Sequence, residues 1–324
     1  MDAPPLLEVS GLRVCFPVKS HPFARKHQRV QAVNGVTFSL AEGETLGVVG
    51  ESGCGKTTLG KAVVRLLTPT SGEIRFEEED LARLRGSRLR AKRRHLQMIF
   101  QDPYGSLDPR MTVAEILGEG LKIHRLAPNR RERQERIEIL LRAVGLEPSH
   151  AFRYPREFSG GQRQRISIAR ALAVDPRLVV CDEPVSALDV SVQAQVINLL
   201  HDLQEERRMA YLFISHDLAV VEHISHRILV MYLGRVVETG PAKAVCGSPK
   251  HPYTQALLSA VPSLDPSTKR KRLILPGELP SPIHPPKGCP FHTRCPVAEP
   301  RCEVEVPVLE GVGEGRAVAC HRVK

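Results

Sequence analysis

The glycines, lysine and threonines at positions 50–58 could bind phosphate groups. Gly50, Gly55, Lys56 and Thr57 form the pattern Gly-x4-Gly-Lys-Thr. Glycines let backbone N–H groups approach phosphate oxygens, and a helix that begins after them adds partial positive charge. The lysine can reach the terminal phosphates and the threonine hydroxyl can bind Mg²⁺. The pattern predicts a phosphate-binding loop, with a glycine turn of no consequence as the alternative. The expected contacts are Gly50, Ser52, Gly53, Cys54, Gly55, Lys56, Thr57 and Thr58.

An acidic pair, Asp182 and Glu183, follows the apolar run 178–181. In an open parallel sheet, ligands bind at the carboxyl ends of the strands. Asp182 could help to hold Mg²⁺, and Glu183 could orient or deprotonate an attacking water. Such a pair taken alone is more often a turn or a helix cap, but the phosphate loop upstream favours the catalytic interpretation.

A second glycine-rich segment, Phe-Ser-Gly-Gly-Gln-Arg-Gln-Arg, occupies residues 158–165. An enzyme with a single closed nucleotide pocket has no need of such a segment. Together with the phosphate loop, it suggests an ATP site that one copy of the chain cannot complete. We therefore expect the nucleotide to lie between two subunits.

Apolar runs predict the strands and helices that position these motifs. Strands are expected at 6–14, 33–40, 44–49, 97–100, 178–181 and 211–214, and as a pair at 227–239 that turns at Gly234. Helices are expected at 56–67, 80–95, 111–145 (two, separated near Pro128), 160–173 and 192–203. This alternation predicts a parallel α/β core, and the mostly helical stretch at about 103–170 reads as an inserted subdomain. Residues 261–290 are rich in proline and suggest an extended connector.

Composition and charge narrow the class of protein. No apolar run approaches the ~18 residues that span a bilayer, and the amino terminus lacks a signal-peptide profile. We expect a cytosolic chain whose membrane role goes through a partner. The net charge of +10 arises largely from basic runs at 83–94, 125–136 and 269–272. A solvated helix face and a linker explain these runs best, with nucleic acid or an anionic membrane as alternatives; no aromatic residues interleave to stack bases.

The ordered set of motifs resembles the ATP-binding subunits of ABC transporters, in which residues 158–165 would be the signature motif. Gln101 in the stretch 98–103 is similar to the Q-loop glutamine, Asp189 in 186–189 to the D-loop, and His216 in 214–217 to the switch histidine. Phe16 is the best candidate for the aromatic that stacks on adenine, although it could equally be a core residue. The resemblance implies the P-loop NTPase fold of ABC ATPases, with an antiparallel β subdomain, a helical insertion and a cysteine-containing C-terminal extension.

The resemblance also implies a head-to-tail ATP sandwich. ATP on Lys56 of one subunit would be covered by Ser159, Gly160, Gly161 and Gln162 of the other. Mg²⁺ would be held by Thr57, Gln101 and Asp182. Glu183, His216 and Gln101 would be the catalytic residues.

Two stretches, 100–110 and 251–258, are similar to the oligopeptide, dipeptide and nickel importer subgroup. The implied domains are an ATPase domain at 1–242 and an extension at 243–324. The implied function is ATP hydrolysis that powers uptake of dipeptides or oligopeptides, with nickel, glutathione or another small solute as the alternative. Implied partners are a second ATPase subunit (a homologue, or else an identical copy), two transmembrane permease subunits and, indirectly, an extracytoplasmic solute-binding protein, but no nucleic acid. The chain would lie peripherally on the cytoplasmic face of the cell membrane.

Four of the eight cysteines crowd the last part of the chain: Cys289, Cys295, Cys302 and Cys320. Structural zinc sites usually contain pairs of ligands two to four residues apart, and no such pair occurs here. Four thiolates on a proline-stiffened segment can hold a 4Fe–4S cluster, and the subgroup resemblance favours the same site. Zinc and unligated thiols remain alternatives. His292 and His321 flank the cysteines as neighbours.

Two other classes of protein fit less well. ABC-type ATPases of translation or DNA repair usually carry two cassettes or a long coiled coil, and no sustained heptad is found here. A cluster-bearing regulator with a vestigial nucleotide site is disfavoured by the intact Lys56, Asp182, Glu183 and His216.

Overall fold

A computed structural model describes residues 4–18, 28–260 and 273–323. The chain divides into two compact units. Unit 1 comprises residues 1–40, 45–82 and 214–324, and unit 2 comprises 41–44 and 83–213. The basic run at 269–272 and the first part of the proline-rich connector lie outside the described residues. The described part of that connector, 273–290, forms neither helix nor strand.

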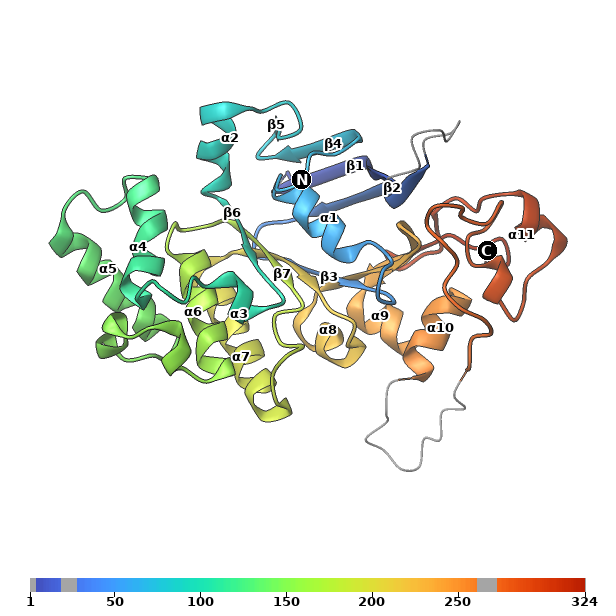
Figure 1. Ribbon diagram of the computed structural model, residues 1–324. Coiled ribbons are helices and arrows are strands. Elements are labelled where there is room, and N and C mark those ends of the chain that lie inside the picture. Colours follow the sequence, from blue (N-terminus) through green and yellow to red (C-terminus); the bar gives the residue numbers. More distant parts are fainter. Residues whose placement is uncertain (1–3, 19–27, 261–272, 324) are drawn as a thin grey trace. The chain divides into compact units, whose positions relative to one another are not determined.

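One antiparallel sheet of unit 1 has the order β2 (Arg29–Leu40), β1 (Leu7–Pro17), β4 (Ser71–Phe76) and β5 (Glu79–Asp80) (Figure 1). Side chains on a strand alternate between its faces. In β1 the buried residues Leu7 and Val9, and then Leu12 and Val14, alternate with exposed ones, and a register shift between Val9 and Leu12 separates the two pairs. This sheet confirms the predicted antiparallel β subdomain and the strands expected near 6–14 and 33–40.

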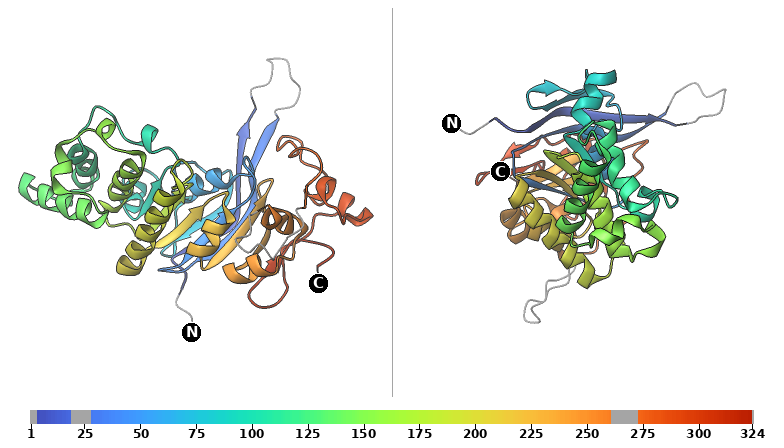
Figure 2. Two further views of the ribbon diagram at one scale, coloured as in Figure 1. Left: turned by 90° about the horizontal axis from the view of Figure 1, so that it is seen from below. Right: turned by 90° about the vertical axis from the view of Figure 1, so that its left-hand side faces the viewer.

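The second sheet of unit 1 contains the strand that leads into the phosphate loop. Its strands in this unit run in the order β11 (Glu310–Gly311), β12 (Ala317–Val318), β10 (Arg235–Pro241), β9 (Arg227–Tyr232) and β3 (Thr45–Val49). Every residue of β3 is buried, and β3 pairs in parallel with β9. The predicted hairpin at Gly234 joins β9 to β10. Strand β12 pairs with β10, so part of the predicted extension (243–324) contributes a strand to this sheet (Figure 2).

The helices of unit 1 are α1 (Lys56–Val63), α8 (Leu218–Ile224), α9 (Ala242–Gly247), α10 (Pro252–Ser259) and α11 (Pro300–Val304), with a 3₁₀ turn, η3, at His292–Arg294. Helix α1 ends four residues before the predicted end at Leu67. Arg65 adopts φ 57°, and the Leu66 N–H donates to the Lys61 carbonyl. The Arg65 N–H also donates to the Ala62 carbonyl. These two bonds form a Schellman cap, which stops the helix without a glycine.

Unit 2 has three strands, β6 (Leu96–Ile99), β7 (Leu178–Asp182) and β8 (Ala210–Ile214), with β7 between the other two. Strands β6 and β7 are parallel, with Leu96 opposite Leu178 and Ile99 opposite Cys181. Strands β7 and β8 are buried along their whole length, as their continuous apolar runs predict for central parallel strands.

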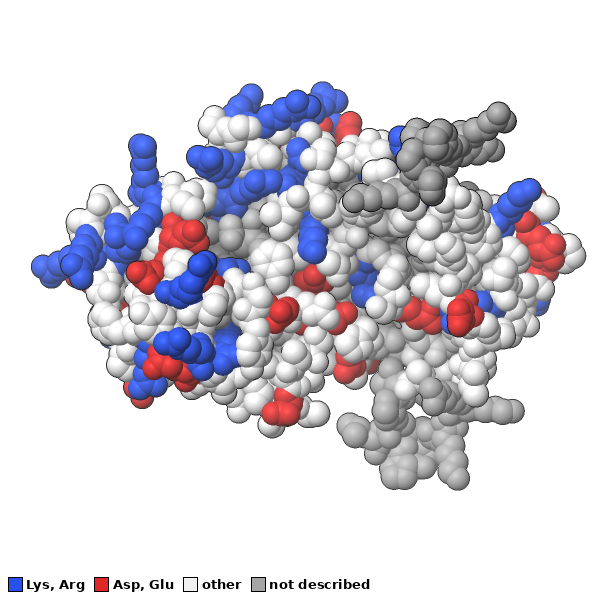
Figure 3. All heavy atoms as spheres, viewed as in Figure 1, with Lys and Arg blue, Asp and Glu red and all other residues white. Residues whose placement is uncertain are grey.

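The helices of unit 2 are α2 (Gly86–Arg93), α3 (Pro103–Ser106), α4 (Val113–Ile123), α5 (Arg130–Ala143), α6 (Gly160–Leu172) and α7 (Val190–Arg207), with 3₁₀ turns η1 at Pro148–Phe152 and η2 at Pro155–Glu157. The two helices expected within 111–145 are therefore present, whereas the helix expected at 80–95 is shorter. No residue of α2 is buried, and basic side chains gather over α2 and α5 (Figure 3). This exposure agrees with the interpretation of the first basic run as a solvated face.

The described residues contain no helix with both the length and the apolar character needed to cross a bilayer.

Candidate active site

The phosphate loop of unit 1 joins β3 to α1 and is packed so tightly that side chains are excluded at two of its glycines. Gly55 is the N-cap of α1, with φ 105°. A Cβ atom at Gly55 would collide with the Ala32 carbonyl oxygen, and one at Gly50 would collide with the Met231 carbonyl oxygen. The loop thus rests directly on the backbones of β2 and β9, which explains the need for glycine at both positions.

The N-terminus of α1 lacks the side-chain cap found at several helices of unit 2. Helices α4, α5 and α6 each begin with a side-chain cap, from Thr112, Asn129 and Ser159. Helix α1 has no side-chain cap. Because the first amides of a helix need acceptors, an uncapped N-terminus after a glycine loop fits an anionic ligand. The residues at 50–58 therefore fit a bound phosphate.

Lys56 is folded back over its own loop. Its side chain is buried, and its Nζ donates to the carbonyl oxygens of Gly50 at 2.6 Å and Glu51 at 3.0 Å. The Cys54 Sγ lies 3.8 Å from the same ammonium group. Burial raises the pKa of the Cys54 thiol, and Lys56 partly opposes this shift. The ammonium group thus lies within the loop, where an incoming phosphate could replace the carbonyl partners.

In unit 2, the register of two parallel strands brings an amide and a carboxylate together. Ile99 lies opposite Cys181, and both strands end within the next residue. Gln101 and Glu183 each follow this pair by two residues, and the Gln101 Nε2 donates to the Glu183 Oε2 at 3.0 Å. Asp182, at the end of β7, is buried. Three of the predicted site residues, Gln101, Asp182 and Glu183, therefore lie together at the carboxyl ends of β6 and β7 in unit 2.

The backbone at Glu183 is strained. Its φ of 46° lies in the left-handed region, which costs a non-glycine residue on the order of 1–3 kcal/mol. The Glu183 carbonyl oxygen accepts hydrogen bonds from the Ser186 N–H at 3.3 Å and the Ser186 hydroxyl at 3.1 Å. These two bonds hold the turn that directs the Glu183 carboxylate toward Gln101.

The signature segment forms the capped start of α6. The Ser159 hydroxyl oxygen accepts from the Gln162 N–H at 3.3 Å, and the Gln162 side chain accepts from the Ser159 N–H at 3.0 Å. This capping box uses the oxygen of Ser159 as an acceptor. The hydroxyl hydrogen of Ser159 is not used by the cap and can be donated to a ligand.

Side chains of α6 hold the segment that follows Gln101. The Arg163 guanidinium lies 4.0 Å from the centre of the Tyr104 ring. The Ser167 hydroxyl is 3.2 Å from that of Ser106, and Arg170 donates to the Ser106 carbonyl oxygen. Helix α6 is therefore tied to α3 at three points within unit 2.

The remaining predicted residues are distributed between the units. His216 and Phe16 belong to unit 1, and Asp189 belongs to unit 2, where it is the N-cap of α7. His216 is exposed. Phe16 is 37% exposed, so it is not a core residue and its ring is accessible for stacking.

The four clustered cysteines line one small cavity of unit 1, together with His251, His292 and His321. Burial raises the pKa of Cys289 to about 11. Within the described residues, no three side chains of histidine, cysteine, aspartate or glutamate converge as ligands of one metal ion. The cysteines thus share a cavity without forming a closed mononuclear site.

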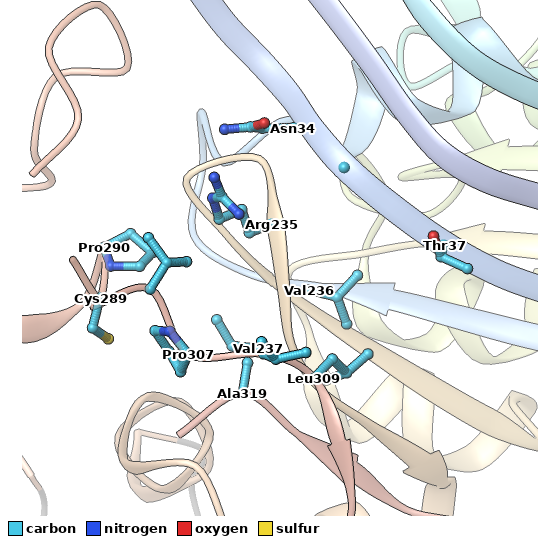
Figure 4. A pocket seen from close by; sticks show the side chains of 13 residues that line it. Asn34, Thr37, Arg235, Val236, Val237, Cys289, Pro290, Pro307, Leu309 and Ala319 are labelled. Atoms are coloured by element: carbon cyan, nitrogen blue, oxygen red, sulfur yellow. The ribbon is translucent and has the colours of Figure 1, made fainter. Parts of the chain in front are cut away.

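A larger cavity, of about 570 Å³, lies elsewhere in unit 1 between β2, β10 and the extension (Figure 4). Its wall is mostly apolar, with Pro290, Pro307 and Leu309 from the extension. Asn34, Thr37 and Arg235 are polar residues in its wall. Of the predicted site residues only Cys289 lines it, so this cavity is separate from the phosphate loop.

Two contacts to the phosphate loop come from residues that the sequence did not single out. Tyr253 and Arg294, both in the extension, bond to Glu51. No local pattern marks these pairs, because they lie 202 and 243 residues apart in the chain.

The fold and the loop define a nucleotide-binding cassette, and the comparisons agree. A family model described as "ABC transporter" matches residues 33–186, and one described as "Oligopeptide/dipeptide transporter, C-terminal region" matches 237–302. Among solved structures, the chain resembles a dimeric, post-hydrolysis state of the ATP-binding cassette MJ0796 bound to ADP and Pi. That match has a TM-score of 0.65 and 28% identity, and it covers 73% of this chain and 98% of the other.

Similarity to curated proteins extends over almost the whole chain. The oligopeptide transport ATP-binding protein AppF of Bacillus subtilis (strain 168) is 54% identical over 98% of this chain and 97% of its own length. The oligopeptide transport ATP-binding protein OppF of Escherichia coli (strain K12) is 52% identical over 98% and 96%. The chain therefore belongs to the ATP-binding subunits of ABC transporters, in the oligopeptide/dipeptide importer group, and it is an ATP-hydrolysing enzyme.

Proposed function

We propose that this chain is the ATP-hydrolysing subunit of an importer that takes up dipeptides or oligopeptides. The observation that carries the proposal is the near-complete match, extension included, to relatives named for oligopeptide transport. The extension matters because the ATPase core alone would fit any importer. Nickel or glutathione as the solute is not favoured by these relatives.

The proposed chemistry divides between two sets of residues. In unit 1, the loop amides and Lys56 bind the phosphates, and the Thr57 hydroxyl binds Mg²⁺. Gln101 and Asp182 would also hold Mg²⁺, and Glu183 would accept the proton of the attacking water. Mg²⁺ would supply charge neutralisation between the phosphates. His216 would orient the terminal phosphate and the water, and Phe16 would stack on adenine.

We propose that the site is completed by a second subunit. Ser159, Gly160, Gly161 and Gln162 would cover the nucleotide held by the partner, with Asp189 at the seam. This role is supported by the Ser159 cap, which leaves the hydroxyl hydrogen available as a donor, and by the positive end of the 13-residue helix α6. The partner ATPase would be a homologue, with an identical copy as the alternative.

The coupling to membrane partners would pass through unit 2. Gln101 bonds to Glu183, and α6 holds the segment after Gln101 at three points. Within this segment the aromatic Tyr104 is 63% exposed, and Phe152, in η1 of the same unit, is 71% exposed. Exposed aromatic side chains are typical of interfaces. We propose that this unit contacts two transmembrane permease subunits at the cytoplasmic face of the membrane, while a solute-binding protein acts on the outer side.

The cysteine cavity is proposed to hold an iron–sulfur cluster. The support is the donor set: four thiols from one extension line one cavity. Zinc is the alternative to the cluster as the bound metal. A domain boundary near residue 242 and a helical subdomain at about 103–170 complete the proposed organisation.

The test is ATP hydrolysis by the chain reconstituted in proteoliposomes with the membrane proteins that co-purify with it. Peptides supplied with the solute-binding protein should stimulate hydrolysis, and Ni²⁺ should not. Lys56→Ala should abolish turnover, whereas Lys61→Ala, a matched charge removal in the last turn of α1, should retain it. Stimulation by Ni²⁺ alone, or full activity of Lys56→Ala, would contradict the proposal.

A further inference from the structure

Glu51, the second residue of the phosphate loop, is bonded to the extension at two separate groups. Its carboxylate receives two hydrogen bonds from the Arg294 guanidinium, at 2.7 and 3.1 Å. Its backbone N–H donates to the Tyr253 hydroxyl at 2.8 Å. The Glu51 carbonyl oxygen, in turn, accepts from the Lys56 ammonium. The residue that receives Lys56 is therefore itself fixed from outside the loop.

Arg294 is built into the extension rather than lying loosely on its surface. Its side chain is 9% exposed, and that of Glu51 is 28% exposed. The Arg294 Nε also donates to the Pro276 carbonyl oxygen at 3.3 Å. The carboxylate of Glu51 raises the pKa of Arg294 above its usual range. A bidentate, mostly buried pair of this kind is among the strongest side-chain hydrogen bonds.

Tyr253 is held by a second set of contacts. It is completely buried, and its ring packs against Tyr232 and Phe291, with centroids 4.8 and 5.4 Å away. Its N–H donates to the Nδ1 of His251, the N-cap of α10. The His251 N–H donates to the buried carboxylate of Glu238 in β10 at 2.9 Å. The hydroxyl that meets the loop is thus anchored to the sheet of unit 1.

We propose that Arg294 and Tyr253 are positioning residues for nucleotide binding, which act through Glu51 and set the conformation of the phosphate loop. Neither residue touches a phosphate. Their contribution is to keep the loop in its binding geometry before ATP arrives. This inference rests on the proposed nucleotide binding at residues 50–58.

We call the contacts of Arg294 and Tyr253 with Glu51 the clamp. The expected consequence of breaking the clamp is weaker ATP binding. A loop that populates its binding geometry only part of the time lowers the apparent affinity by that fraction. Coupling across a contact pair of this type corresponds to a roughly two- to 160-fold change in dissociation constant. Turnover at saturating ATP should change little, because bound ATP itself orders the loop.

The experiment measures ATP affinity of the full-length chain by calorimetry, and KM and kcat in the reconstituted importer. Arg294→Gln and Glu51→Gln should each raise the dissociation constant and KM. The double variant should bind ATP no more weakly than the weaker-binding single variant, since each substitution alone already removes the Arg294–Glu51 ion pair. Arg294→Lys should recover part of the affinity, and Tyr253→Phe should produce a separate, additive loss.

Arg301→Gln is the matched control, because it breaks an exposed ion pair with Glu305 in the same extension. It should bind ATP as the wild type does. If Arg294→Gln binds ATP with wild-type affinity, the clamp proposal is wrong. It is also wrong if Arg294→Gln lowers the affinity for ATP equally in the wild-type chain and in the Glu51→Gln variant. If Arg294→Gln does not fold, Glu51→Gln still tests the clamp, since the extension is then unaltered. If Lys56→Ala binds ATP as the wild type does, the nucleotide-site assignment fails instead.

Discussion

Substitution of Gly161 tests why the signature segment has a glycine at this position. The two candidate reasons are the close packing of α6 on α7 and the proposed contact with the partner subunit's nucleotide. A Cβ atom at Gly161 would collide with the Cγ1 of Val192 in α7, whereas one at Gly160 would lie 3.6 Å from the Leu188 Cδ2, an ordinary contact. Valine has a single favoured rotamer in a helix and cannot easily turn away. Gly161→Ala should therefore strain the packing of α6 on α7, and Gly160→Ala should not.

The magnitude follows from the overlap. One added methyl group in a closely packed contact costs about 1–3 kcal/mol. For a chain of this size, each kcal/mol lowers the midpoint of thermal unfolding by about 2–4 °C. We expect Gly161→Ala to unfold about 2–12 °C below the wild type, and Gly160→Ala to unfold at or above the wild-type midpoint. Val192→Ala in the Gly161→Ala background should restore most of the loss.

Calorimetry of the four proteins, paired with ATP turnover in the reconstituted importer, completes the test. If Gly161 also lies against the nucleotide of the partner subunit, turnover should stay low in the stabilised double variant. Full turnover in that variant would mean that Gly161 serves packing alone, which refutes the sandwich contact. A wild-type midpoint for Gly161→Ala would refute the packing argument.

Three further predictions concern the chemistry. Glu183→Gln, purified together with its partner ATPase subunit, should slow hydrolysis by roughly 10²–10⁴ while ATP accumulates in a stable dimer of the two, detected by light scattering; separate monomers at saturating ATP would contradict the sandwich. Protein purified without oxygen should be brown, and Cys320→Ser should lose the colour while Cys246→Ser keeps it; a colourless, zinc-loaded wild type would overturn the cluster. Because burial raises the pKa of Cys54, iodoacetamide should modify it more slowly at neutral pH than it modifies the half-buried Cys15, as peptide mass spectrometry can show; faster labelling of Cys54 would contradict its burial.

The sequence predicted best those features that depend on residues close together in the chain, such as buried strands and the apolar face of a helix. The apolar runs near 45–49 and 178–181 are strands because both of their faces are buried. The helix expected at 192–203 is likewise present within α7, and its apolar residues Val196, Leu200 and Leu203 are buried on one face. The meeting of Gln101 and Glu183 also follows from the sequence once β6 and β7 are aligned in parallel.

Features that depend on distant partners could not be predicted in this way. Strand β12 has two residues and exists because β10 offers it an edge, so no alternation marks it. Helix α1 was expected to continue to Leu67, since a non-glycine cap at Arg65 gives no compositional signal. The Arg294–Glu51 pair joins residues 243 positions apart, and nothing near either one identifies the other.

The two units position their site residues by different means, and this difference suggests a division of labour. The phosphate loop is held by close backbone contacts at Gly50 and Gly55 and by the bonds of Glu51 to Arg294 and Tyr253. In unit 2, the hydrogen bond between Gln101 and Glu183 joins an exposed amide to a half-buried carboxylate. Because the acceptor is a carboxylate, exchanging such a bond for one to water or a ligand changes the free energy by at most about 1.5–3 kcal/mol. Nucleotide binding can therefore depend on the firmly held phosphate loop. The switch to hydrolysis can depend on the Gln101–Glu183 hydrogen bond, which is easily exchanged. Coupling to a partner subunit requires such an exchangeable bond.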